Sequence, residues 1–152
     1  MTYRIVDEPS PSSLERLTVN PFWPLLGSML AGGWLAWPWF ALNSAALGRG
    51  RRFDGDLAVL GLGIAVNGAL VFAVHEALKA GLVQHREYAD LVPQAARLTI
   101  LYVLFLRQQR TYQLFEHFGG AGRNGLFVVM AGAVMRGAVL SKLPPLLRLL
   151  LG

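Results

Sequence analysis

The 152 residues are unusually apolar: 54% are hydrophobic and only 15% are charged, against about 25% charged in an ordinary soluble domain. The chain has no cysteine, which excludes disulfides, thiolate metal sites and cysteine nucleophiles, and its net charge of +5 suits contact with anionic lipid headgroups. Nucleic-acid binding is disfavoured, because no compact basic patch interleaved with aromatic residues lies outside the apolar stretches. The composition indicates an integral membrane protein.

An uncharged stretch near the N-terminus organises the chain. Leu17 to Gly48 contains no Asp, Glu, Lys, Arg or His, and about 20 apolar residues are enough to cross a bilayer as a helix. The stretch is longer than the apolar core of a signal peptide and follows a tail of mixed charge, so we expect it to be retained. We therefore divide the chain into a polar tail, 1–20, and a transmembrane domain, 21–152, whose first helix covers 21–47 with a kink at Pro38.

Three further helices are predicted from apolar periodicity and from the glycines, prolines and charges that interrupt it. They cover about 57–78, 91–118 and 126–140. The helix at 91–118 has only a short charge-free run, and its later half mixes apolar and charged residues, so we expect it to extend beyond the bilayer. The sequence thus predicts an all-α fold, an integral membrane four-helix bundle.

Two of these helices carry small residues at four-residue spacing, a pattern that lets a neighbouring helix approach closely. We expect both stripes to be helix-packing faces, and we expect Asn67, near the middle of the second helix, to make an interhelical hydrogen bond. The first stripe is Ser28, Gly32 and Ala36, and the second is Gly61, Ala65, Ala69, Ala73 and Ala77.

Charged residues inside the predicted helices mark a candidate site. Four crossings would bring His75, Glu76, Arg97 and Arg136 to the same third of the membrane, where charges usually face the bundle interior or pair with one another. One interpretation is an anion or lipid-headgroup site, or a proton-coupled path through Glu76. The interpretation that we favour is a structural ion pair between Glu76 and an arginine, with the second arginine snorkelling to the interface.

Further arginines lie just beyond the apolar stretches, where they are expected to contact lipid headgroups. The basic residues that would flank the membrane are evenly divided between its two sides, so the positive-inside rule alone does not orient the chain. If Arg97 and Arg136 snorkel to the side that carries both termini, that side becomes the more basic and is cytoplasmic. The predicted headgroup contacts are Arg49, Arg51, Arg52, Arg107 and Arg110.

The sequence contains no pattern that indicates catalysis. Each of the three histidines lies within two residues of a glutamate, but their spacing matches no ligand motif, so we predict neither a metal site nor a cofactor. The few hydroxyl side chains lack an adjacent base that could activate them. We therefore expect a protein that is not an enzyme.

The segment GGWLAWPWFALNSAALGRGRR, residues 32–52, joins a small-residue helix to Asn and then to Leu-Gly-Arg. It resembles some uncharacterised small bacterial membrane proteins with four predicted helices. The likeness covers about one helix, with a vaguer similarity around QQRTYQLFEHFGG, residues 108–120. The resemblance implies a location in a bacterial inner membrane.

These observations favour a multi-pass membrane protein that acts by binding, as an accessory subunit or as an immunity-type partner of a larger membrane or secreted component. The expected partners are the lipid bilayer and either a second copy of the chain or another membrane protein. The alternative is an oligomeric small transporter or channel subunit with a polar path at Glu76, Arg97 and Arg136. A third possibility is an enzyme that acts on lipid at the interface.

Overall fold

The regular structure of the described part of the chain is helical, as predicted. The computed structural model describes residues 14–48, 51–82 and 86–152. Over these residues no strand forms, and the single bridge joins Val19 to Arg123. The elements in chain order are η1 (Glu15–Leu17), α1 (Phe22–Leu30), α2 (Gly33–Ala46), α3 (Arg51–Lys79), α4 (Arg86–Ala89), α5 (Leu91–His117), α6 (Leu126–Ser141) and α7 (Pro145–Leu151).

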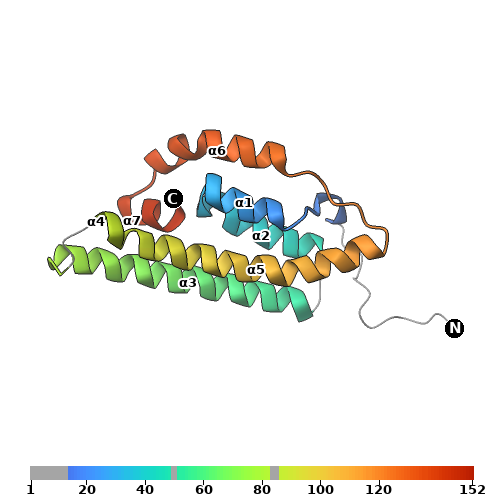
Figure 1. Cartoon of the computed structure of the whole chain (residues 1–152), viewed down its shortest axis with the longest axis horizontal. Helices are drawn as coiled ribbons and strands as arrows, with labels where there is room; N and C mark the ends of the chain where they lie inside the picture. The colour runs from blue at the N-terminus through green and yellow to red at the C-terminus, as the bar shows by residue number, and fades with distance from the viewer. Residues whose placement is uncertain (1–13, 49–50, 83–85) are drawn as a thin grey trace.

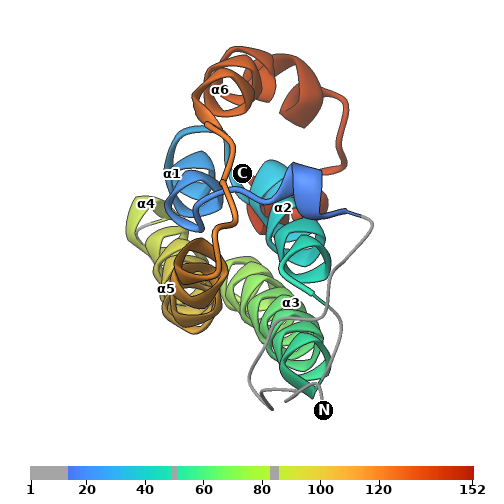
Figure 2. The same ribbon diagram turned by 90° about the vertical axis from the view of Figure 1, so that its right-hand side faces the viewer.

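The helices form three layers along one long axis (Figure 1). The antiparallel pair α3 and α5 makes the first layer, α1 and α2 lie on it, and α6 covers α1 (Figure 2). The short C-terminal helix α7 fills the end of the bundle where α3 finishes, and it contacts α2, α3 and α6. The opposite end is closed by η1, where the main-chain N–H of Arg123 donates a hydrogen bond to Thr18 O (2.8 Å).

The predicted helix over 21–47 is two helices, so the prediction of one kinked helix is wrong. The chain leaves α1 at Ala31, reverses at Gly32 and returns as α2, which packs against α1. Gly32 has a φ of 102°, a conformation that side chains with a Cβ rarely adopt. Pro38, the expected site of distortion, lies inside α2.

The other helices agree well with their predicted bounds. The segments 57–78, 91–118 and 126–140 correspond to α3, α5 and α6, with α3 beginning earlier, at Arg51. From its apolar composition, the tail over residues 146–152 is expected to rest at the membrane interface. These residues instead continue α7 into the bundle and pack against α3.

An apolar layer between α2 and α5 holds the bundle together. Phe40, Leu101 and Leu104 are fully buried in it, beside Trp37 and Ala36. The α3–α5 interface is tight at Gly63, where an added Cβ would collide with the Ile100 side chain. A small residue therefore permits this contact between the two long helices, but it is not a member of the predicted stripes.

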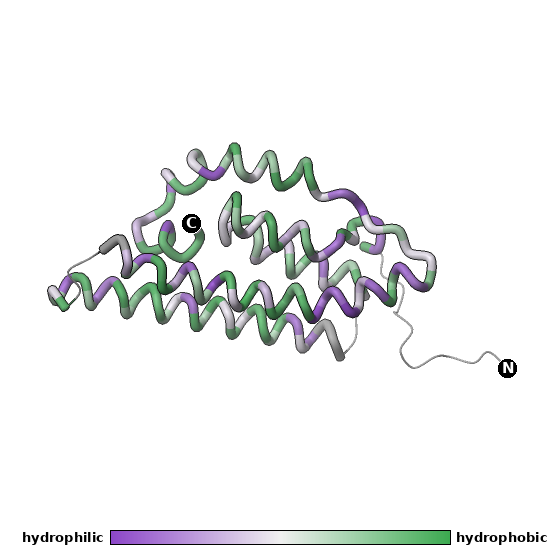
Figure 3. The backbone as a smooth tube through the Cα atoms, viewed as in Figure 1, coloured by the Kyte–Doolittle hydropathy of each residue, from purple (hydrophilic) through white to green (hydrophobic). Residues whose placement is uncertain are grey.

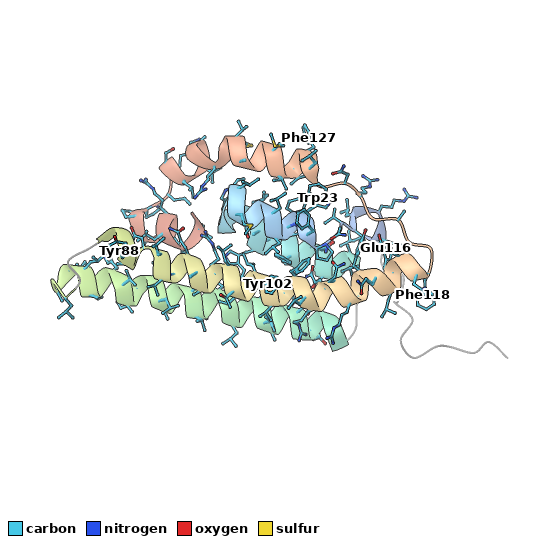
Figure 4. All side chains as sticks on the ribbon, in the orientation of Figure 1. Trp23, Tyr88, Tyr102, Glu116, Phe118 and Phe127 are labelled. Atoms are coloured by element: carbon cyan, nitrogen blue, oxygen red, sulfur yellow. The ribbon has the colours of Figure 1, made fainter. Side chains whose placement is uncertain are left out.

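Many large apolar side chains are exposed on the helices, and hydrophobic residues recur along the length of α3 and α6 (Figure 3). Phe127 on α6 is 84% exposed and projects away from the bundle (Figure 4), and Leu62 on α3 is 67% exposed. One helix of the described residues, over Asp54–Lys79, is long and apolar enough to cross a membrane, and only 17% of its most apolar stretch is buried. This length and composition support association with a membrane.

Candidate functional site

A chain of buried polar side chains connects α2 with α5 and α3. Asn43 accepts a hydrogen bond from the main-chain N–H of Val19 (3.0 Å) and donates one from Nδ2 to Gln108 Oε1 (2.9 Å). Gln108 Nε2 donates in turn to Phe40 O (2.9 Å) and to Ser44 Oγ (2.8 Å). The side chains of Asn43, Ser44 and Gln108 are almost completely buried. Each amide group therefore has partners on both sides, which is the condition for burying it at low cost.

The same chain of hydrogen bonds reaches the surface through an ion pair. Ser44 Oγ donates to Asp56 Oδ2 (2.9 Å), and Arg107 Nε donates to Asp56 Oδ1 (2.8 Å). Beside this pair lies an open pocket of about 440 Å³, lined by Asp56, Val103, Leu106, Arg107, Arg110 and Thr111. The Arg107 side chain is partly exposed and Arg110 is exposed. Two guanidinium groups beside a threonine hydroxyl can bind an oxyanion such as a headgroup phosphate.

The last part of α5 packs on the end of α2. Tyr112 and Phe115 form a small buried cluster with Leu47. Arg107 of α5 pairs with Asp56, which lies near the start of α3. Tyr112 follows Arg107 along α5, so it lies outside the part of the bundle that is level with the apolar residues of α3. Burial, assisted by the hydrogen bond and negative charge of Glu116, raises the pKa of the Tyr112 phenol to about 12. The phenol therefore stays neutral and serves for packing.

A second polar group lies at the other end of the bundle, around α7. Arg97 is 4% exposed, and its Nη2 donates to Gly152 O (2.9 Å). Arg136 Nη2 donates to the same oxygen (3.2 Å), and Arg136 Nη1 lies 3.4 Å from Leu30 O. Asn67 Nδ2 contacts Leu150 O of α7 (3.4 Å), so Asn67 makes a contact between helices, as expected. Two arginines from α5 and α6 thus meet at one main-chain oxygen.

The structure divides the four charged residues that the sequence grouped together. Arg97 and Arg136 share an acceptor, as described above. Glu76 instead accepts a hydrogen bond from Lys79 Nζ (3.0 Å) on the exposed side of α3, and His75, its neighbour in sequence, is half-buried. The ion pair between Glu76 and an arginine, which we favoured from the sequence, is not the arrangement found.

An apolar layer separates the two polar groups. Arg97 and Gln108 both lie on the inner face of α5, about 16 Å apart at 1.5 Å per residue. Leu101 and Leu104 lie between them and are fully buried against Phe40. Within the described residues, the side chains therefore do not form a continuous polar path along the bundle.

The two small-residue stripes have different positions. Ser28, Gly32 and Ala36 are buried inside the bundle. Gly61, Ala65, Ala69 and Ala73 are exposed on the outer face of α3, and Ala77 is half-buried. The second stripe thus lies on the side of α3 away from the interior, and no neighbouring atom lies within 4 Å of a Cβ added at Gly61.

Four of the five predicted headgroup contacts lie at one end of the bundle. Arg107 and Arg110 line the pocket beside Asp56. Arg51 and Arg52 lie in the first turn of α3, and Arg49 is outside the described residues. The four that the structure places therefore lie near one another along the long axis (Figure 1).

Sequence reasoning missed the polar chain through Asn43, Ser44, Gln108 and Asp56. A usable signal was present: Asn43 and Ser44 are adjacent polar residues in a stretch that lacks any charge, and polar groups in such stretches usually face the interior. Their partner Gln108 is not indicated by any spacing, because it lies on another helix.

No protein-family model matches the chain, and no curated protein or solved structure is significantly similar to it.

Proposed function

We propose that the protein is a multi-pass membrane protein that acts by binding, without catalysis, as an accessory subunit or immunity-type partner of a larger membrane or secreted component. The resemblance of residues 32–52 to small bacterial membrane proteins favours a bacterial inner membrane. In this proposal α3, α5 and α6 cross the bilayer. The pair α1 and α2 enters it from one side as a hairpin.

One observation carries the proposal: several polar side chains are buried while many large apolar side chains are exposed. Asn43, Gln108 and Arg97 are buried, whereas Phe127 and Leu62 face outward. A monomeric soluble protein rarely exposes apolar patches larger than a few hundred Å². Exposed apolar side chains need no explanation if lipid surrounds them, and in lipid the polar groups must find partners inside.

The outer face of α3 supports a role in binding. Its stripe of Gly61, Ala65, Ala69 and Ala73 is exposed, although small residues at this spacing favour close contact between helices. The interior contact of α3 uses Gly63 instead. The stripe therefore remains available for a helix from a second copy or from another membrane protein.

Cross-linking in native membranes tests this proposal, because the sequence contains no cysteine and any introduced cysteine is unique. We expect Ala69→Cys to form a cross-linked adduct, whose mass identifies a second copy or a different partner. Ala138→Cys is the matched control, since Ala138 is exposed on α6 and belongs to neither predicted stripe. The proposal fails if carbonate washing releases the chain from membranes, or if Ala69→Cys and Ala138→Cys react alike.

One observation favours the second candidate, an oligomeric transporter or channel subunit: Arg97 and Arg136 meet inside the bundle. The apolar layer of Phe40, Leu101 and Leu104 argues against it. The variant that combines Glu76→Gln and Arg97→Met separates the two functions. A binding protein keeps its Ala69→Cys adduct in this background, whereas a transporter shows flux in liposomes that this variant lacks.

A further inference from the structure

The open pocket between α3 and α5 has an apolar end and a cationic end. All but one of its lining residues belong to a single face of α5. The apolar ones, Val103 and Leu106, come first along the helix, and the polar ones, Arg107, Arg110 and Thr111, follow. From Val103 to Arg110 the helix rises by about 10 Å at 1.5 Å per residue. The pocket is therefore amphipathic along the axis of α5.

The cationic end of this pocket lies where the apolar span of α3 begins. Asp56, the lining residue from α3, is close to the start of the span Asp54–Lys79. Asp56 pairs with Arg107, whereas Ile100, earlier on α5, packs at Gly63, later on α3. The part of α5 before Arg107 therefore runs toward the middle of the span, and the part after it runs out of the span. In a bilayer that α3 crosses, the apolar end of the pocket meets acyl chains and the cationic end meets headgroups.

The side chains that line the pocket carry one net positive charge. Arg107 and Arg110 each contribute a positive charge, and Asp56 contributes a negative one. Both carboxylate oxygens of Asp56 are already bonded, Oδ1 to Arg107 and Oδ2 to Ser44, and the residue is only 8% exposed. Among the described residues that line the pocket, none thus offers a carboxylate to an ammonium group. The pocket suits a ligand with a single negative charge better than it suits a zwitterion.

Donors for such an anion are present on the same face of α5. Arg107 uses Nε for Asp56, and its side chain is 42% exposed, which leaves its Nη groups to a further acceptor. Arg110 is exposed, and no ion pair or hydrogen bond joins its side chain to another described residue. The hydroxyl of Thr111 lies beside them. Guanidinium groups bind phosphate oxygens through strong, charge-assisted hydrogen bonds.

We propose that this pocket binds the phosphate of a lipid with one net negative charge and an uncharged headgroup, of the phosphatidylglycerol kind. Its phosphodiester balances the charge of the pocket, and an acyl chain lies along Val103 and Leu106. Free phosphate would make the same oxyanion contacts but would leave these two exposed apolar side chains without a partner. The inference rests on the membrane location proposed above, and it is independent of the outer face of α3.

The test is the melting temperature of the full chain, purified in a neutral detergent, with ligands added at equal concentration and ionic strength. The ligands are dioctanoyl phosphatidylglycerol, dioctanoyl phosphatidylcholine and glycerol phosphate. A ligand that binds the folded state stabilises it by RT ln(1 + [L]/Kd). We expect a saturable increase with phosphatidylglycerol, and none with the zwitterionic lipid or with the phosphate that lacks acyl chains.

Arg110→Gln removes a guanidinium group that the fold does not use. We expect it to weaken the apparent affinity for phosphatidylglycerol about tenfold, the effect of losing a hydrogen bond to a charged group. Arg123→Gln is the matched control, because Arg123 is exposed at the same end of the bundle but does not line the pocket. It should leave the affinity unchanged. If Arg110→Gln does not fold, Thr111→Val tests the same pocket, with an expected loss of about fivefold for one neutral donor.

The proposal is overturned if phosphatidylcholine stabilises the protein as well as phosphatidylglycerol, or if no ligand has an effect. It is also overturned if Arg110→Gln and Arg123→Gln respond alike, since the lipid would then respond to general surface charge. Equal stabilisation by glycerol phosphate would assign the pocket to a soluble oxyanion instead of a lipid. The Ala69→Cys adduct and the carbonate wash do not depend on this pocket, so failure of the lipid site can be distinguished from failure of the proposed function.

Discussion

Gln108 connects three helices through its side-chain amide. It bonds Asn43, Ser44 and Phe40 O of α2, and through Ser44 it is linked to Asp56 of α3. Gln108→Leu would leave Asn43 Nδ2 and Phe40 O without their partner, and each unsatisfied buried group costs about 1–3 kcal/mol. We expect an unfolding free energy lower by roughly 3 kcal/mol, measured by denaturant unfolding in detergent.

Gln113→Leu is the control for this prediction, because Gln113 is exposed on the same helix. We expect its effect to stay within about 0.5 kcal/mol. Equal losses from the two substitutions would show that the buried chain of hydrogen bonds does not stabilise the fold. The comparison thus separates the role of the amide from a general effect of adding leucine to α5.

At the scale of single residues, the sequence identified the buried Arg97 and the half-buried Arg136 but not their partners. Arg97 and Arg136 stand out because charges interrupt apolar stretches, and such charges usually face the interior. Gly152, which both contact, carries no chemical signal, because its contribution is a main-chain oxygen. Contacts to main-chain atoms depend on where a distant segment folds, and this cannot be read from residue types.

The turn between α1 and α2 is the element that most changes the expected architecture. Gly32 combines a φ of 102° with a tight environment, since an added Cβ would lie 2.7 Å from Leu151 O and 2.8 Å from Gly152 O. Gly32→Ala should therefore lower the unfolding free energy by about 1–3 kcal/mol and loosen α7. Unfolding and limited proteolysis of the C-terminal segment measure the two effects.

Gly61→Ala, on α3, is expected to have the opposite effect on the unfolding free energy. Gly61 lies inside α3, and no atom lies within 4 Å of an added Cβ. Alanine has a higher helix propensity than glycine, so we expect a gain of about 0.5–1 kcal/mol. If Gly32→Ala lowered the unfolding free energy no more than Gly61→Ala does, the turn would not require the positive φ of Gly32.

At the scale of elements, the sequence predicted helices better than their ends. Long apolar stretches with clear interruptions located α3, α5 and α6. The break at Gly32 was missed because the same glycine also fits a small-residue stripe, and Pro38 appeared to be the stronger interruption. The inward course of α7 was missed because an apolar tail suits an interface as well as an interior.

The reversal at Gly32 also changes the orientation expected for the whole molecule. With α1 and α2 as a hairpin, η1 and α7 lie at opposite ends of the bundle, so the two termini would not share one side as four crossings require (Figure 1). Basic residues are more numerous at the end with η1 and the start of α3. That end has Arg16, Arg51, Arg52, Arg107, Arg110 and Arg123, and the other has Lys79, Arg86, Lys142 and Arg148.

The positive-inside rule then predicts that the end carrying η1 and the start of α3 faces the cytoplasm. The measurement is labelling of single cysteines in intact spheroplasts by a reagent that does not cross membranes. Ala80→Cys, exposed after α3, should react at once, and Ala121→Cys, exposed between α5 and α6, should react only after permeabilisation. The reverse labelling pattern would show that the protein has the opposite orientation in the membrane. Reaction of both sites in intact cells would mean that α5 does not cross, because α5 is the helix that connects the two labelled ends of the bundle.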